Sequence, residues 1–155
     1  MSLGLPSCDE GRIYNTDTVQ TVEGGTVHFS GEVKGTETWS QGYTLALAGF
    51  EDGNDYALIS KNIETSVSDG KCDITLSGIP AEVTAIELCE VYRLRRRVAT
   101  FLSADYNPQD GTLQLSAEGI DISMSAAIQT EIFNTTCIQC HGGTGHAAAG
   151  LDLLD

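Results

Sequence analysis

Most of the chain alternates apolar and polar residues in short runs separated by turn-forming residues. The runs 26–33, 43–50 and 71–79 each place their apolar side chains on one face of an extended strand. Further strands are expected at 19–22, 55–61 and 112–123. The segment 81–107 should form two strands or one bent strand, because its apolar parity shifts between Leu88 and Cys89. Seven or eight strands at intervals of about ten residues predict a mainly β fold, an antiparallel β-sandwich of immunoglobulin-like type over residues 19–120.

The pattern changes from period two to period 3.6 near residues 118–121. Residues 123–141 contain neither glycine nor proline, and Met124, Ile128, Ile132 and Phe133 recur at helical spacing. Ser123 or Ser125 can cap the start of such a helix, and Asp121 precedes it at the positive end of its dipole. We therefore expect a short C-terminal helix that runs up to or through Cys137.

This helix leads into the sequence Cys137-Ile138-Gln139-Cys140-His141, which is a Cys-x-x-Cys-His motif. Two cysteine sulfurs at this spacing can form thioether bonds to the vinyl groups of one porphyrin, and the adjacent histidine can ligate the iron. Thioredoxin-like redox sites also use Cys-x-x-Cys, but within a βαβ pattern that is not found here. The motif therefore favours covalent haem.

The stretch from about residue 126 to residue 153 resembles the start of a c-type cytochrome domain. It is most similar to those of envelope lipoproteins in Bacteroidetes and Planctomycetes, where CxxCHG is followed by small residues and AGLDL. The resemblance implies haem c on Cys137 and Cys140, with His141 as the proximal iron ligand, and one-electron transfer to an unknown redox partner in the envelope. Such domains continue further to supply a distal Met or His, whereas residues 142–155 contain no methionine. We therefore expect residues 121–155 to be the truncated N-terminal part of such a domain, and a fragment made without export to lack haem.

The other cysteines suggest export and anchoring. Cys8 closes the sequence Leu-Pro-Ser-Cys, which resembles a bacterial lipobox. The stretch before Cys8 lacks the basic and apolar regions of a working signal peptide, so we expect that the true signal has been removed, that Cys8 is lipidated and that residues 1–18 form a tether. The alternative is that Cys8 is a free thiol. Cys72 and Cys89 lie in strand-like sequence and could form a disulfide in an oxidising compartment, or remain two separately buried thiols. These features predict a periplasmic or outer-membrane-anchored protein of the bacterial cell envelope.

Charge narrows the set of partners. The chain carries 22 acidic and 8 basic residues, a formal charge of −14, which argues against nucleic acid and against anionic lipid surfaces. Membrane attachment is therefore expected only through Cys8, since no apolar run reaches transmembrane length. Four of the basic residues fall within Arg93–Arg97, and a strand would place Arg93, Arg95 and Arg97 on one face. These arginines could be solvated and paired with acidic neighbours. Alternatively, they could bind haem propionates or an acidic partner.

Other chemistry is weakly indicated. Zinc could in principle use Cys137, Cys140, His141 and His146, although adjacent ligands at 140 and 141 suit one tetrahedral ion poorly. His28 is expected to be a surface or partly buried side chain of a strand. Trp39 is expected in the core, although Trp39 and Tyr43 could instead stack on a sugar or a partner. No catalytic motif is present, so we expect no enzyme. The alternative to electron transfer is a non-catalytic β-sandwich that binds another envelope component and carries no haem.

Overall fold

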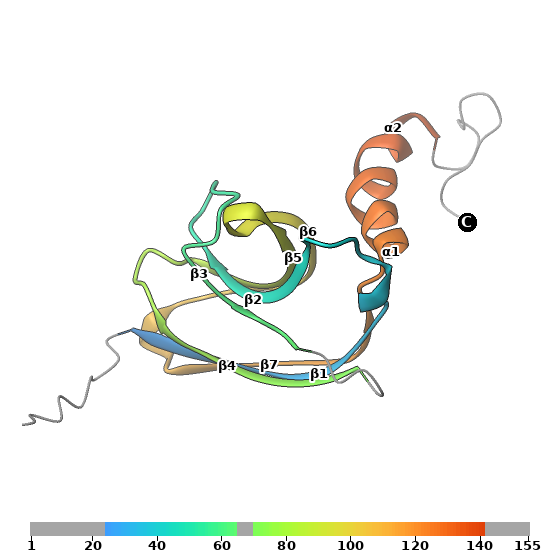
Figure 1. Cartoon of the computed structure of the whole chain (residues 1–155). Helices are drawn as coiled ribbons and strands as arrows, with labels where there is room; N and C mark the ends of the chain where they lie inside the picture. The colour runs from blue at the N-terminus through green and yellow to red at the C-terminus, as the bar shows by residue number, and fades with distance from the viewer. Residues whose placement is uncertain (1–23, 65–69, 142–155) are drawn as a thin grey trace, which may run out of the picture.

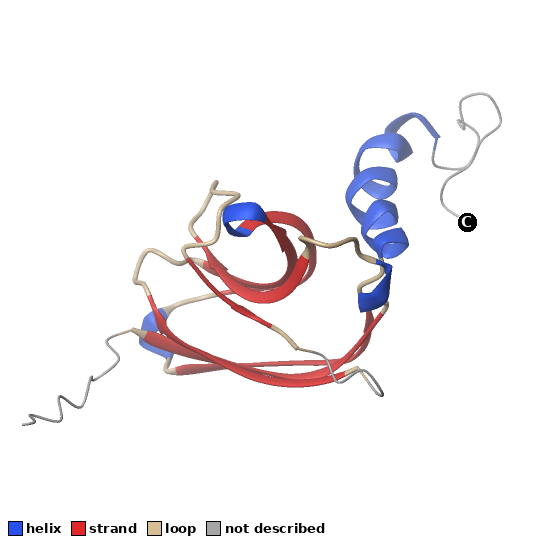
Figure 2. Cartoon of the chain, in the orientation of Figure 1, coloured by secondary structure: helices blue, strands red, loops and turns tan. Residues whose placement is uncertain are grey.

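The computed structural model describes residues 24–64 and 70–141, which form two β-sheets and a C-terminal helix (Figure 2). In chain order the elements are β1 (Gly25–Lys34), η1 (Thr36–Thr38), β2 (Thr44–Phe50), β3 (Ile59–Asn62), β4 (Lys71–Ile79), β5 (Ala85–Tyr92), η2 (Arg93–Arg95), β6 (Arg96–Asp105), η3 (Pro108–Asp110), β7 (Thr112–Asp121), α1 (Met124–Ile128), η4 (Gln129–Cys137) and α2 (Ile138–His141). The expected tether, Cys8, the strand 19–22 and His146 lie outside the described residues.

The strands form a sandwich-like pair of sheets. One sheet has the order β4-β1-β7 and the other the order β3-β2-β5-β6, and Figure 1 shows them facing each other. Neighbouring strands are antiparallel except β1 and β7, which are parallel. The mainly β, sandwich-like architecture of two largely antiparallel sheets is therefore confirmed, whereas the parallel pairing of β1 with β7 was not predicted. A parallel pair is accessible here because β1 and β7 are far apart in sequence and need no tight hairpin between them.

The main core lies between the two sheets and follows the strand periodicity. On β4, Cys72, Ile74 and Leu76 are buried while the residues between them are exposed, as predicted. Phe29 on β1 pairs with Ile74 on one side and with Leu115 on the other. Leu45, Leu47, Ile86 and Leu88 close this core from the second sheet.

A second, smaller cluster lies on the opposite face of the four-stranded sheet. Its residues alternate with the main core along β2 and β5 and are mostly small; they are Ala46, Ala48, Phe50, Ala57, Cys89 and Val91. Figure 1 shows β2, β5 and β6 curling strongly around this face. Small side chains suit the tight curvature.

Residues 55–57 cross the end of this curl instead of beginning a strand. The Ala57 N–H donates to the carbonyl of Arg95 at 3.1 Å, and the Arg97 N–H donates to the carbonyl of Asp55 at 2.8 Å. The predicted strand 55–61 is therefore wrong in its first half, because β3 begins only at Ile59. The backbone groups of residues 55–57 are used to pair with β6.

The segment 81–107 forms two strands, one of the two forms expected. The β5–β6 register shifts between Leu88 and Cys89, where the apolar parity changes in the sequence. The two strands are joined by η2, so Arg93 and Arg95 form a turn. The prediction that they share one strand face with Arg97 is wrong.

Candidate functional site: the helix that carries the cysteine pair

The helix begins where the sequence predicts and is fixed at its first turn. The Ser123 hydroxyl accepts a hydrogen bond from the Ala126 N–H at 3.2 Å, which makes Ser123 the N-cap. The Ser123 N–H donates to the Asp121 carboxylate at 2.9 Å, and this hydrogen bond lowers the pKa of Asp121. The Met124 N–H donates to the Thr38 hydroxyl at 2.8 Å. The start of the helix is thereby tied to the loop between β1 and β2.

The middle of the helix departs from α geometry. Gln129–Cys137 form a π-helix, flanked by the α-helical segments Met124–Ile128 and Ile138–His141. The side chains of Gln129 and Asn134, five residues apart, are joined by a hydrogen bond of 2.9 Å. Hydrogen bonds in a π-helix run from i to i+5, so residues four and five apart share a face. Steps of four, four, five and three residues then place Met124, Ile128, Ile132, Cys137 and Cys140 along one side.

The predicted haem-attachment residues lie at the C-terminal end of this helix. Cys137 ends the π-helix and is half-buried, Cys140 lies three residues later and is exposed, and both thiols are free. His141 is half-buried and is the last described residue. The structure thus brings the two sulfurs and the imidazole onto the last turns of one helix.

A shallow apolar groove separates the helix from the sandwich. It encloses about 260 Å³ and is lined mainly by Trp39, Tyr43, Val98, Met124, Ile128 and Ile132. Trp39 is half-buried between the sandwich and the start of the helix, where its indole N–H donates to the carbonyl of Ile122 at 2.6 Å. The centroid of its ring lies 5.4 Å from the ring centroid of Tyr43 and 6.5 Å from that of Phe101. Trp39 therefore belongs to the helix attachment and not to the central core that the sequence favoured.

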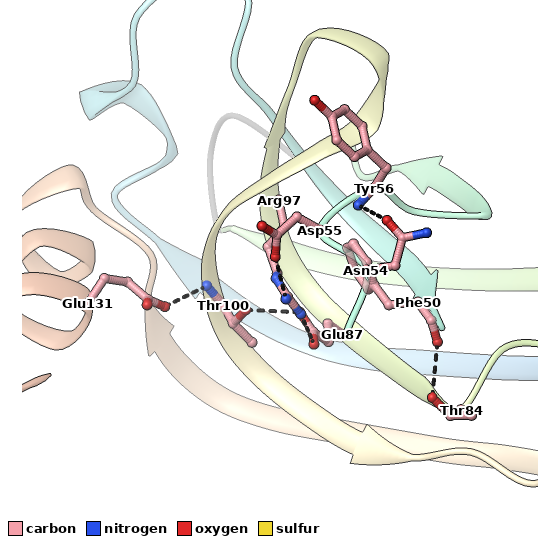
Figure 3. Close-up of polar contacts among 9 residues, drawn as sticks. All are labelled: Phe50, Asn54, Asp55, Tyr56, Thr84, Glu87, Arg97, Thr100 and Glu131. Carbon is pink, nitrogen blue, oxygen red and sulfur yellow. Dashed lines mark hydrogen bonds and ion pairs between the residues drawn. The ribbon is translucent and has the colours of Figure 1, made fainter. Parts of the chain in front are cut away.

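A chain of polar contacts links the helix to the curled sheet (Figure 3). The Glu131 carboxylate accepts the backbone N–H of Thr100 at 3.0 Å, and the Thr100 hydroxyl donates to Glu87 at 2.9 Å. Arg97 donates to Glu87 at 2.7 Å and to Asp55 at 2.9 Å. The Arg97 guanidinium also lies 4.8 Å from the centre of the Phe50 ring. The buried carboxylate of Glu87 is thus compensated by one cation and one hydroxyl.

Glu90 is a buried acidic residue that the sequence analysis missed. It is 2% exposed, and burial raises its pKa to about 7. Glu87 and Glu90 interrupt the otherwise apolar segment Ala85–Tyr92. Two acidic residues within such an apolar strand are unusual, and this is the sequence feature that could have identified Glu90 as a buried acid.

The two strand cysteines are separate buried thiols. Cys72 lies on β4 in the main core, and Cys89 lies on β5 in the second cluster, on the other side of the four-stranded sheet. The structure therefore holds the second of the two forms that the sequence allowed and contains no disulfide between them. Burial raises the pKa of both thiols.

His28 and the possible metal ligands among the described residues can also be examined. His28 lies on the outer face of the three-stranded sheet between Asp73 at 3.0 Å and Gln114 at 2.9 Å; these hydrogen bonds raise its pKa. Within residues 24–64 and 70–141, no three His, Cys, Asp or Glu side chains are grouped as ligands for one metal ion. The zinc alternative also uses His146, which lies outside the described residues, and it therefore stays untested.

No protein-family model matches the chain, and no curated protein sequence matches it. Among the described residues, none of the helices has the length and apolar character needed to cross a membrane.

Proposed function

We propose that this protein is an electron-transfer protein of the bacterial cell envelope that carries one covalent haem c on its C-terminal helix. One observation carries the proposal: two free cysteine thiols and the adjacent histidine lie on the last turns of a single helix. Cys137 and Cys140 would attach the porphyrin vinyl groups, and His141 would ligate the iron. The bound iron would supply reversible one-electron exchange.

The described residues fit such a group. The two cysteines lie on neighbouring turns, and neither is buried: Cys140 is exposed and Cys137 is half-buried. The segment that bears them is held by hydrogen bonds at Ser123, Met124 and Glu131. In this proposal the sandwich is an immunoglobulin-like carrier that fixes the haem-bearing helix, and a lipid on Cys8 holds the protein at the membrane.

Peptide mapping tests the proposal. The full chain, fused to a signal peptide, would be exported in a bacterium that matures c-type cytochromes, and the peptide containing residues 137–141 would be weighed by mass spectrometry. We expect the mass of one haem on that peptide, lost when Cys137 and Cys140 are both changed to Ser. The matched control, Cys72→Ser, should retain haem because Cys72 lies between the sheets. Recovery of the peptide from folded, exported protein without haem would contradict the proposal.

Trp39 gives a second readout. It is the one tryptophan of the chain and packs at the base of the same helix. Haem attached to that helix should quench its fluorescence strongly by energy transfer. The Cys137→Ser/Cys140→Ser protein should emit normally, and equal emission from both proteins would argue against haem at this position.

A further inference from the structure

The β5–β6 hairpin ends in a tight turn built from unusual residues. Leu94 has φ 57° and ψ 26°, Arg95 has φ 62°, and the Arg96 N–H donates to the carbonyl of Arg93. Two consecutive residues with positive φ closed by this hydrogen bond form a type I′ turn, which matches the twist of a hairpin. Asn-Gly is the favoured pair in such turns, since an L side chain in this conformation is strained.

Leu94 and Arg95 therefore occupy positions whose positive φ disfavours residues with a side chain. A leucine here gains nothing from burial, because Leu94 is 84% exposed. Strain retained at an exposed position that packs against nothing is more typical of a functional surface than of a folding requirement.

The surroundings of Leu94 make an amphipathic surface, which we call the hairpin tip: Arg93, Leu94, Arg95, Arg96 and Tyr56. Tyr56 is 48% exposed and is the cross-strand partner of Arg96. Figure 3 shows the Tyr56 side chain pointing away from the Asp55–Arg97–Glu87 contacts. Leucine and tyrosine supply apolar contact area, while the arginines supply charge.

The arginine side chains of the hairpin tip are only partly engaged. The Arg93 guanidinium lies 5.3 Å from the centre of the Tyr92 ring, and Arg95 donates to the carbonyl of Leu58 at 3.1 Å. Both contacts orient the guanidinium groups without neutralising them. Arg97, in contrast, is paired with Glu87 and Asp55 and belongs to the polar chain described above.

We propose that the hairpin tip binds a carboxylate-rich segment of a partner protein that also presents an apolar side chain to Leu94 and Tyr56. Charge complementarity selects this occupant: the hairpin tip holds three of the eight basic residues, Arg93, Arg95 and Arg96, in a chain whose net charge is −14. The rest of the surface repels an acidic partner and thereby directs it to the tip. Arginine forks suit carboxylates. An anionic membrane would be repelled by the whole acidic body at once.

The Leu94→Asn/Arg95→Gly variant separates this role from a structural one. The probe is a fluorescein-labelled peptide of eight glutamates around two central leucines, followed by fluorescence anisotropy at low and high salt. The native chain should bind it saturably, less tightly at high salt. The variant should bind at least about tenfold more weakly, a loss of 1.4 kcal/mol, although its thermal midpoint should rise because the turn is relieved of strain.

Controls keep the outcomes distinct. Arg96→Glu should abolish binding, whereas Lys34→Ala, which removes one charge from the other sheet, should leave it unchanged. Unchanged peptide binding by the Leu94→Asn/Arg95→Gly variant would overturn the proposal, as would binding to vesicles with 30% anionic lipid but not to the peptide. A lowered thermal midpoint in that variant would show that Leu94 and Arg95 serve the fold instead.

Discussion

Arg97→Met should be one of the most destabilising single changes in the described part of the sandwich. Methionine keeps an aliphatic stem over Phe50 but leaves the Glu87 carboxylate with Thr100 as its one remaining partner. The Glu87 side chain is 7% exposed, and removing one partner of a buried pair costs about 3–5 kcal/mol. The Arg97 side chain is itself 30% exposed, so water can partly replace the guanidinium beside Glu87. We therefore expect the free energy of unfolding to fall by about 3 kcal/mol. With an m-value of about 1.5 kcal/mol/M, the urea midpoint should fall by about 2 M.

Two controls test whether the buried carboxylate is the cause. Asp55→Asn removes the exposed partner of Arg97 and should cost less than about 1 kcal/mol, because the Asp55 side chain is 62% exposed. The double variant Glu87→Gln/Arg97→Met should recover much of the loss, since no buried charge is left unpaired. The assay is urea unfolding at pH 7 followed by Trp39 fluorescence. The reasoning is refuted if Arg97→Met costs no more than Asp55→Asn, or if the double variant is less stable than Arg97→Met.

Three further predictions use single sites. Burial raises the pKa of Glu90 from 4.5 to about 7, so the folded chain binds more protons and its stability should fall by up to about 3 kcal/mol between pH 4.5 and 7.5. Glu90→Gln should remove that part of the pH dependence of urea unfolding, and an unchanged slope would contradict the assignment. Glu131→Ala should speed hydrogen exchange at the Thr100 amide, because the free energy of opening at that amide falls by about 1 kcal/mol. Unchanged exchange would mean that the contact is not formed. In haem-free protein iodoacetamide should label Cys140 rapidly and Cys89 only after unfolding; equal rates would contradict their burial.

The strands and the start of the helix were predictable because their signals are local. Alternation on β4 identifies its buried face without knowledge of its partners, and a serine before an apolar helical stripe identifies the cap. The bulge beside Cys89 was visible as a change of parity within one strand. Each of these features depends on residues only a few positions apart.

The features that were missed depend on contacts between distant residues. Residues 55–57 have a strand-like composition, but they pair with the beginning of β6, some forty positions later. The arginine run could not be read as a type I′ turn because its residues are the ones that such turns avoid. Glu87 is tolerable in a buried strand only because Arg97 and Thr100 reach it across the sheet.

The placement of Cys137 and Cys140 was only partly predictable. Their spacing fixes their separation along the helix, but the π-helical segment determines the side on which they lie relative to Ile128 and Ile132. Nothing in residues 129–137 signals this geometry by periodicity alone.

The optical spectrum of the exported full chain tests the central proposal most directly. Acid–acetone extraction first removes any haem that is not covalently bound. The extracted wild-type protein, reduced with dithionite in pyridine, should then show the α-band of a haem c. The Cys137→Ser/Cys140→Ser variant should give none, and His141→Ala should change the spectrum of the native protein. A folded, exported, colourless wild-type protein would contradict haem attachment, and the sandwich would then stand as a binding module of the cell envelope.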